Sequence, residues 1–465
     1  MLWNEPEPMV ELRLLKEPNP RTEQALLNEP KLKVELRLSK EPEAKTESML
    51  LNEAEPKAEV RLSNDPEPKI EQARVEKPKS KQQQLDDIKK FKKALSEGDH
   101  HNIIDLLTKR SKMARLKFRQ DVEQSYNDRS DVTKSGRINL IELVKKKLKG
   151  DFKHLIVAIL TPLPTFYAKE LHRAFKGLGT NEDAVLEILC TVNNDQLRFI
   201  KKHYVKKYNR ELIDDIKGDT SGNFGRLLES LSSSERDECP YLDIENLKAE
   251  DRKAMVEQAN IDAQALYDGG VKRWGTDESI FCQIMCQRSH IQLRLIFEEY
   301  IEVSRRSKKE DPNNNEYEDL VVHENRKSQT KNQRVKDVIR TVCRLKSVSE
   351  EYNSGYEKYT IEAAIEEEFS GDMKNALLAI VESVQKKPKF FAKQLYRIIK
   401  DMKSTIKTRF RTSIRDVIRI VVTRCEIDLD DIKKEYDTKY GSLADAIKDN
   451  TTGSLQEGLL ALIKE

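Results

Sequence analysis

The segment LHRAFKGLGTNEDAVLEIL (171–189) carries the clearest structural pattern in the chain. It reads as a helix, a glycine-rich loop ending in Gly-Thr, and acidic residues that open a second helix. The segment QALYDGGVKRWGTDESIFCQIM (264–285) repeats this order. Apolar residues on both sides of each loop recur every three to four positions, the spacing of an amphipathic helix. The pattern predicts two copies of one helix–loop–helix unit.

A second pattern occurs four times along the chain. Its copies are KKKLKGDFKHLIVAIL (145–160), DDIKGDTSGNFGRLLESL (214–231), AAIEEEFSGDMKNALLAIV (363–381) and DAIKDNTTGSLQEGLLALI (445–463). Each copy reads as one helix, a short polar break and a second helix. No sustained strand alternation interrupts them. We therefore expect an all-α body of four similar modules, built from helices of about 8–15 residues that share one core.

Composition excludes several classes of protein. Acids and bases nearly cancel over 465 residues, 81 against 84, so the net charge of +3 does not by itself call for a nucleic acid. The six cysteines form no CxxC pair, which argues against a zinc ribbon or a disulfide scaffold. No apolar run approaches the roughly 18 residues of a spanning helix. Because HExxH, GxSxG and P-loop motifs are also missing, we expect no enzyme.

The N-terminal residues differ from the rest. Residues 4–75 repeat every 12 positions, with units such as NEPEPMVELRLL and KEPNPRTEQALL, and prolines recur in most of them. Regular prolines block a continuous helix, and each unit has too few apolar residues to fold alone. We expect a disordered, proline-broken arm. Short stacked turns, or an array that binds a protein partner, remain the alternatives.

The glycine-rich loops suggest a chemistry. Glycines in Phe175–Thr180 let the backbone turn so that several carbonyls point to one place. Calcium takes six to eight oxygens, many of them carbonyls or water, and a carboxylate completes such a cage. Asp219, which we expect to begin a helix 39 residues after Thr180, would supply it if the two helix pairs lie side by side. The loop and the distant acid together predict a calcium site.

These motifs make residues from about 82 to 465 resemble the annexin core of four repeats with five helices each. KGLGTNED with GDTSG is similar to the second annexin repeat, and GGVKRWGTDES with EEEFSG to the third. The resemblance implies these boundaries: arm 1–81, first repeat 82–161, second repeat 162–240, third repeat 241–387 with an insertion at 305–357, and fourth repeat 388–465. It does not cover the 12-residue units.

The resemblance also implies the calcium ligands. In the second repeat they are the carbonyls of Phe175, Gly177 and Gly179 with the carboxylate of Asp219. In the third they are the carbonyls of Gly270, Arg273 and Gly275 with the carboxylate of Glu368, which lies 92 residues after Thr276.

The first and fourth repeats depart from this pattern. In the first, the loop position reads Ser96-Glu97-Gly98-Asp99 and the acid position is Lys147; in the fourth, Asn450 replaces the acid. A lysine repels calcium, and an asparagine offers only a neutral carbonyl. Both parts of the calcium site, the glycine-rich loop and the acid, are missing from these two repeats. We therefore expect calcium sites in the second and third repeats only.

The function that this resemblance implies is calcium-dependent binding to acidic, phosphatidylserine-like membranes by a cytoplasmic protein that associates peripherally. Trp274, at the tip of the third-repeat loop, is a candidate for insertion among the headgroups. The basic fourth-repeat segment DMKSTIKTRFRT (401–412) offers Lys403, Lys407, Arg409 and Arg411 to the same surface. The alternative is a cytoskeletal or scaffolding relative with little calcium dependence.

Overall fold

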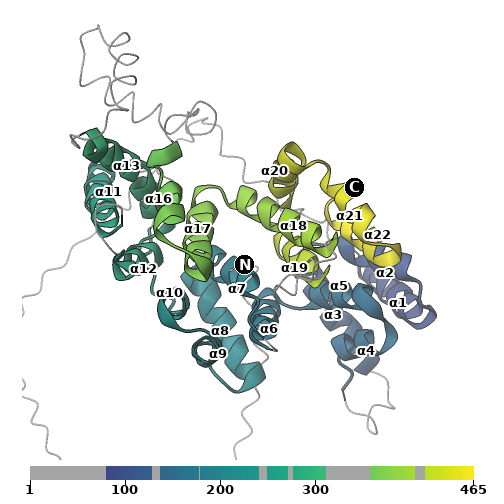
Figure 1. Cartoon of the computed structure of the whole chain (residues 1–465). Helices are drawn as coiled ribbons and strands as arrows, with labels where there is room; N and C mark the ends of the chain where they lie inside the picture. The colour runs from purple at the N-terminus through teal and green to yellow at the C-terminus, as the bar shows by residue number, and fades with distance from the viewer. Residues whose placement is uncertain are drawn as a thin grey trace, which may run out of the picture. The chain divides into compact units, whose positions relative to one another are not determined.

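The computed structural model describes residues 80–127, 137–176, 179–239, 249–270, 276–309, 357–403 and 414–464 (Figure 1). Every α-helix in these ranges belongs to one of four successive groups of five, and no strand occurs in them. The predicted all-α fold with five helices per repeat is therefore confirmed. The repetitive arm, through residue 79, and residues 310–356 of the expected insertion lie outside the described residues.

The first two repeats have similar helix lengths. The helices of the first repeat are α1 (Lys81–Glu97), α2 (His100–Thr108), α3 (Lys112–Asn127), α4 (Leu140–Lys147) and α5 (Gly150–Leu160). Those of the second repeat are α6 (Leu163–Phe175), α7 (Glu182–Thr191), α8 (Asn194–Tyr208), α9 (Leu212–Asp219) and α10 (Gly222–Leu231).

The last two repeats follow the same order. The third contains α11 (Ala249–Gly269), α12 (Glu278–Gln287), α13 (His290–Lys309), the 3-10 turn η3 (Glu357–Tyr359), α16 (Ile361–Glu368) and α17 (Gly371–Gln385). The fourth contains α18 (Lys387–Lys403), α19 (Ile414–Arg424), α20 (Leu429–Tyr440), α21 (Leu443–Asn450) and α22 (Gly453–Leu462).

Two helices of the third repeat exceed the predicted lengths. Helix α11 has 21 residues and α13 has 20, so the expectation of about 8–15 residues was wrong for them. Neither helix is interrupted by a proline. Helix α13 also continues to Lys309, beyond residue 305, where we expected the insertion to begin.

Polar caps fix where the helices start. The side chain of Asn181 accepts the Ala184 N–H at 3.0 Å and begins α7, and Thr360 accepts the Ala363 N–H at 3.3 Å and begins α16. Such bonds satisfy backbone donors that the first helical turn leaves unpaired. The acids after Asn181, Glu182 and Asp183, lie in the first turn as predicted.

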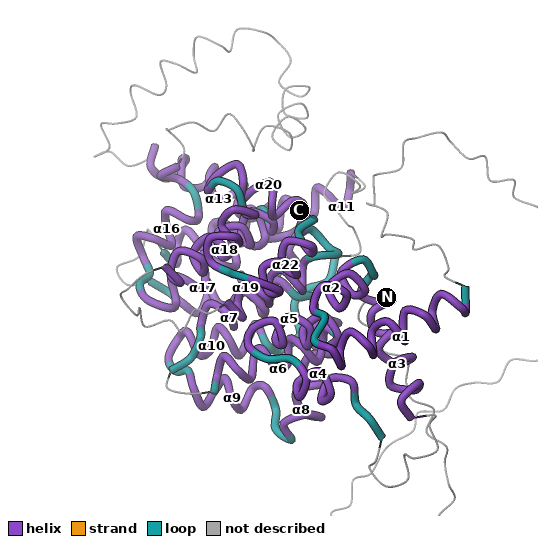
Figure 2. The backbone as a smooth tube through the Cα atoms, turned by 90° about the vertical axis from the view of Figure 1, so that its right-hand side faces the viewer, coloured by secondary structure: helices purple, strands orange, loops and turns teal. Residues whose placement is uncertain are grey.

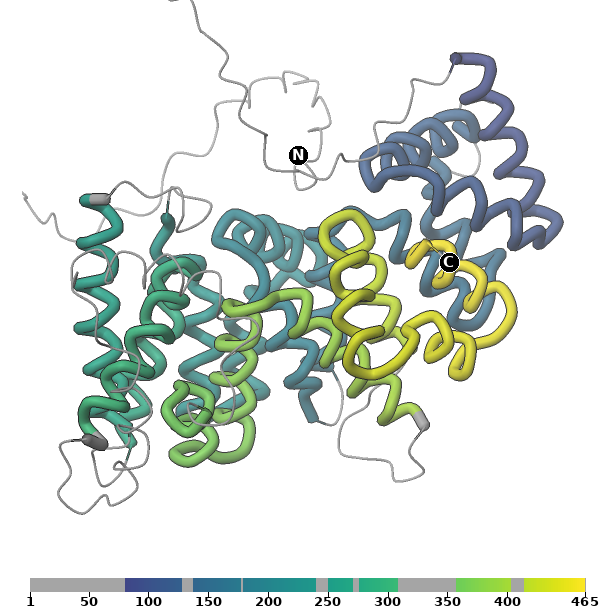
Figure 3. The backbone as a smooth tube through the Cα atoms, turned by 90° about the horizontal axis from the view of Figure 1, so that it is seen from above, coloured from purple at the N-terminus to yellow at the C-terminus, as the bar shows by residue number. Residues whose placement is uncertain are grey.

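The second and fifth helices of each repeat form most of the contacts between repeats. Helix α10 packs on α12 and α7 on α17, which joins the second repeat to the third. Helix α2 packs on α22 and α5 on α19, which joins the first repeat to the fourth. Figure 3 shows the yellow C-terminal helices beside the blue first repeat, and Figure 2 shows the same helices from the side. The core is therefore continuous across repeats.

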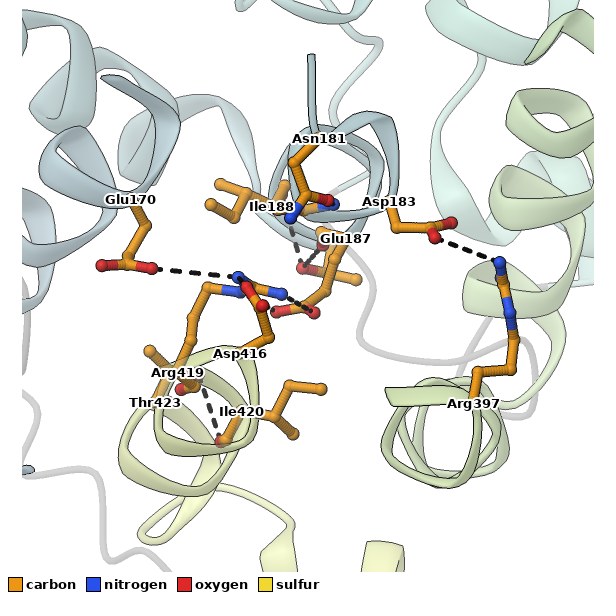
Figure 4. A network of polar contacts seen from close by, with 12 residues as sticks. Glu170, Asn181, Asp183, Glu187, Ile188, Arg397, Asp416, Arg419, Ile420 and Thr423 are labelled. Atoms are coloured by element: carbon orange, nitrogen blue, oxygen red, sulfur yellow. Dashed lines mark hydrogen bonds and ion pairs between the residues drawn. The ribbon is translucent and has the colours of Figure 1, made fainter. Parts of the chain in front are cut away.

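A buried group of charges crosses from the second repeat to the fourth (Figure 4). Arg419 of α19, whose side chain is 2% exposed, donates from Nε and Nη2 to the two carboxylate oxygens of Glu187 on α7, at 2.9 and 2.7 Å. Arg173 of α6 pairs with Asp416 of α19 at 2.6 Å and with Glu170 at 2.7 Å. Each buried ion has a charged partner, which offsets its desolvation.

Candidate calcium sites

The fourth helix of every repeat ends at the position where the site requires its acid. Lys147, Asp219, Glu368 and Asn450 are the last residues of α4, α9, α16 and α21. The prediction that Asp219 begins a helix was therefore wrong: Asp219 ends α9, and Thr220 and Ser221 are extended. The polar break after Asp219 belongs to the connection between the two helices.

In the third repeat the loop and the distant acid meet. The Asp277 N–H donates to the Gly269 carbonyl at 2.8 Å and closes the loop at its base. The Thr276 hydroxyl donates to Oε2 of Glu368 at 2.9 Å, although 92 residues separate them. Gly270 directly follows α11, whereas Arg273, Trp274 and Gly275 lie outside the described residues. The structure thus brings Glu368 to the end of this loop.

In the second repeat the corresponding parts line one small cavity. The Asn181 N–H donates to the Ala174 carbonyl at 2.9 Å and closes the loop. An open cavity of about 180 Å³ beneath it is lined by His172, Phe175, Lys176, Arg210, Asp215, Gly218 and Asp219. Phe175 and Asp219 therefore share a cavity, and the Asp219 side chain is exposed to solvent. Gly179 has a φ of 85°, and Gly177 lies outside the described residues.

Sequence reasoning missed a second, buried carboxylate in this cavity. Asp215 accepts a hydrogen bond from the Tyr204 hydroxyl and pairs with Arg210 at 2.7 Å. His172 stacks on Tyr208, with ring centroids 3.7 Å apart, and its Nδ1 lies 3.6 Å from Asp215. Burial, and then the bond to Asp215, raise the pKa of Tyr204. Asp215 is thus engaged by protein donors, and Asp219 is the carboxylate left for a ligand. The only sequence signal was the four-residue spacing to Asp219.

The third repeat lacks this second carboxylate. Tyr300, which occupies the place of Tyr204, is buried, and its hydroxyl has no partner in the described part of the chain. Burial raises the pKa of Tyr300, and the nearby Tyr267 and Glu368 raise it further. Ala364, four residues before Glu368, stands where the second repeat has Asp215. The two sites therefore share their loop and terminal acid but differ beneath them.

The first repeat has no room for a comparable loop. Only Gly98 and Asp99 connect α1 to α2, compared with residues 176–181 and 270–277 in the next two repeats. The Asp99 N–H donates to the Ala94 carbonyl at 2.9 Å, and the Asp99 side chain caps α2. Lys147, at the acid position, is exposed. The backbone between α1 and α2 therefore forms an ordinary turn between two helices.

In the fourth repeat, the residue at the acid position bonds within its own helix. The side-chain amide of Asn450 donates to the Ala446 carbonyl of the same helix at 2.7 Å. Lys403 is the last residue of α18, and Lys407, Arg409 and Arg411 lie outside the described residues. Within the described ranges, no three His, Cys, Asp or Glu side chains gather as a metal centre. A site built from carbonyls and one carboxylate would not form such a group.

None of the described helices is both long and apolar enough to cross a bilayer. The cysteines in the described ranges are free thiols, and Cys286 of α12 is buried in the core.

Comparison with known proteins identifies the family. The annexin family model matches residues 166–231, 261–311 and 390–462. Human annexin A3 is 33% identical over 365 residues, 78% of this chain and 87% of its own. Human annexin A4 is 32% identical over 381 residues, 81% and 93% of the two chains. The solved structure of annexin III is 31% identical, with a TM-score of 0.61, and the match covers 82% of this chain and 94% of that one.

The chain belongs to the annexin family. Annexins are in general non-enzymatic proteins, and calcium-dependent phospholipid binding is a property of the family. The resemblance inferred from KGLGTNED and GGVKRWGTDES is therefore confirmed.

Proposed function

We propose that this annexin binds acidic phospholipid membranes in a calcium-dependent manner, as a cytoplasmic protein that associates with them peripherally. The observation that carries the proposal is the 2.9 Å bond from Thr276 to Glu368, which joins a glycine-rich loop to an acid 92 residues away. A loop of carbonyls beside one carboxylate suits calcium, a hard cation that prefers oxygen ligands.

The proposed ligands are those that the annexin resemblance implies. The third-repeat site uses the carbonyls of Gly270, Arg273 and Gly275 with the Glu368 carboxylate. The second-repeat site uses the carbonyls of Phe175, Gly177 and Gly179 with the Asp219 carboxylate. Support comes from the cavity that Phe175 and Asp219 line together.

Four or five protein oxygens leave a calcium shell incomplete, since calcium takes six to eight. Bound calcium would supply open positions that a lipid phosphate or a serine carboxylate can fill. The exposed Asp219 side chain and the exposed Gly179 face solvent, so a headgroup can approach them. Calcium and lipid then each raise the other's affinity, because each completes the site for the other.

The first test removes both carboxylates. The double variant Asp219→Ala/Glu368→Ala should lose calcium-driven sedimentation with phosphatidylserine vesicles, because each remaining carbonyl loop carries only partial charges. Each single variant should shift the calcium requirement to higher concentration, by roughly tenfold for about 1.4 kcal/mol of lost binding.

The matched control removes two exposed carboxylates elsewhere. Asp195→Ala/Glu366→Ala changes the net charge equally, and Glu366 lies on the same helix as Glu368. This control should sediment like the parent. Full calcium-driven binding by the Asp219/Glu368 variant would refute the ligand assignment. Calcium-independent binding of the parent would instead favour the scaffolding alternative.

We further propose that the fourth repeat contacts the membrane through fixed positive charge. The segment 401–412 begins in the last turn of α18 and stands where the other repeats hold their loop. It carries Lys403, Lys407, Arg409 and Arg411 with only one acid, Asp401. Basic residues near an anionic leaflet contribute on the order of 1 kcal/mol each. Trp274 would add an aromatic contact at the third-repeat loop.

Residual sedimentation with phosphatidylserine vesicles in chelator measures this contribution. It should weaken as salt is added, because exposed charges are screened. Replacing the four basic residues by Gln should remove it, while calcium-driven binding persists. If chelator abolishes all binding at low salt, or the Gln variant binds like the parent, the fourth-repeat contact does not exist.

A further inference from the structure

Lysines from three helices converge where the first repeat meets the second. Lys145 lies in the last turn of α4, Lys169 in the middle of α6 and Lys207 near the end of α8. All three act electrostatically on the same acid, Glu142, and Lys145 and Lys207 act on Lys169. We call Lys145, Lys169 and Lys207 the junction lysines; helices α4, α6 and α8 can be followed in Figure 2.

Hydrogen bonds hold the three helices in place around this junction. Glu123 of α3 accepts the Leu140 N–H at 2.8 Å, which fixes the start of α4. Arg119 of α3 bonds to the Leu160 carbonyl at 3.4 Å, just before α6 begins. Thr165 of α6 and His203 of α8 lie 2.9 Å apart, which sets these two helices side by side. These bonds fix the start of α4 and hold α6 beside α8, the helices that carry the lysines.

The positive charge at the junction is only partly balanced. Glu142 is bound to Lys145 at 2.7 Å, and Glu123 is bound to Arg119 at 3.1 Å. In the described part of the chain, no acid pairs with Lys169, which is half-buried. The pKa of Lys169 is lowered to about 8, first by burial and then by the charges of Lys207, Lys145 and Arg119, against the pull of Glu142. Three exposed lysines (Lys146, Lys147 and Lys149) follow Lys145 in the sequence.

A compact group of like charges has a definite ligand preference. The free protein bears the mutual repulsion of the lysines, and a multivalent anion would remove it on binding. Three ammonium groups from three different helices can each meet a separate phosphate. A single phosphate would satisfy only part of the group, and an extended nucleic-acid backbone would call for a longer basic stripe than this junction provides.

We propose that the junction lysines form a calcium-independent site for a polyphosphorylated inositol, either free or as the headgroup of a phosphoinositide lipid. This site goes beyond the calcium-dependent function proposed above, and it uses neither calcium loop. Lys147 is the last residue of α4, at the position that Asp219 and Glu368 occupy in the second and third repeats. The first repeat thus presents fixed positive charge at the end of its fourth helix.

The site predicts a pH signature that distinguishes it from general charge attraction. The anion binds better when Lys169 is protonated, so affinity should fall as the pH rises through about 8. The groups that set this behaviour are Lys207 on α8, Lys145 and Glu142 on α4, and Arg119 on α3. Lys169→Arg should keep the affinity and lose the pH dependence, because arginine stays charged over this range.

The experiment is calorimetric titration of the full chain with inositol hexakisphosphate in chelator. The triple variant Lys145→Gln/Lys169→Gln/Lys207→Gln should weaken binding by roughly tenfold to a hundredfold. The control Lys90→Gln/Lys389→Gln/Lys439→Gln removes the same charge from exposed lysines elsewhere and should bind like the parent.

A second arm separates free from lipid-bound ligand. Phosphatidylcholine vesicles containing a phosphatidylinositol bisphosphate are sedimented in chelator, with and without competing inositol hexakisphosphate. Vesicle binding that the triple variant loses assigns the site to a lipid, and binding of the soluble compound alone assigns it to a free inositol phosphate. Equal losses in the triple variant and the control, or no binding by the parent in either arm, would overturn the proposal. Calcium-driven sedimentation of the triple variant with phosphatidylserine should persist, so failure here leaves the calcium sites untouched.

Discussion

Four glycines occupy equivalent places, each three residues after the end of the fourth helix of a repeat. Gly150, Gly222, Gly371 and Gly453 each begin a fifth helix with φ between 58° and 63°. This left-handed conformation lets the chain turn after Asp219 and Glu368 so that their carboxylates stay at the helix end. A Cβ added at any of them would meet no atom within 4 Å, so only the backbone conformation demands glycine.

Gly222→Ala should therefore lower the free energy of unfolding by about 1–2 kcal/mol through backbone strain alone. Gly218→Ala is the matched control, because Gly218 lies in α9 with an ordinary helical φ and equally open surroundings. It should be neutral, or stabilising by up to about 1 kcal/mol. Chemical denaturation measures both. Equal effects of the two changes would contradict the strain argument.

Some residues of the candidate sites could be predicted from the sequence, and others could not. Asp219 and Glu368 were identifiable because a glycine-rich loop and a helix-terminal acid recur together. Asp215 and Arg210 carry no such mark, because a helical acid and a nearby arginine usually face solvent. Their roles depend on how α6, α8 and α9 pack, which local spacing does not contain.

Individual helices are well predicted from apolar spacing, whereas their partners are not. The spacing identified the amphipathic face of α7, but the buried pair between Glu187 and Arg419 joins residues from the second and fourth repeats. Burial raises the pKa of Glu187, and Arg419 works against that rise. Asp416 and Glu170 also raise it, since three acids share the network with two arginines.

Arg419→Met should cost roughly 3–5 kcal/mol of stability, because it leaves Glu187 and Asp416 buried without their main cation. Arg397→Met is the control: its side chain is 42% exposed and pairs with Asp183 at 3.0 Å. Loss of that pair should cost about 1 kcal/mol or less. Thermal unfolding of both variants measures the contrast, and a mild effect of Arg419→Met would show that Arg173 alone balances the acids.

At the scale of the whole molecule, cations donate to carbonyls near helix ends, and two of these bonds join different repeats. Arg236 donates to the Met285 carbonyl at 3.0 Å, Lys387 to the Thr191 carbonyl at 3.2 Å, and Arg294 to the Val384 carbonyl at 2.8 Å. These bonds satisfy carbonyls at or near the ends of α12, α7 and α17. His290 lies among the three cations, and burial and then these charges lower its pKa to about 3.

The stability should consequently fall between about pH 6.5 and pH 3, because the unfolded chain protonates His290 and the folded chain resists it. One such group contributes a slope approaching about 1.4 kcal/mol per pH unit. His290→Asn should flatten the slope in this window and leave the stability near neutral pH little changed. Unfolding midpoints of parent and variant across the window decide the matter, and an unchanged slope would exclude His290 as its source.

The pairing of second and fifth helices has a consequence for synthesis on the ribosome. Helices α2 and α5 emerge early, but their partners α22 and α19 are the last and nearly the last parts of the body to be made. The second and third repeats can pair while translation continues. The apolar faces of the first repeat stay exposed, and prone to aggregation, until the C-terminal helices have been made. A chain released before Ile414 would leave Ile156 and Leu155 of α5 without their cover, so premature termination should yield a chaperone-bound product rather than a shorter working protein.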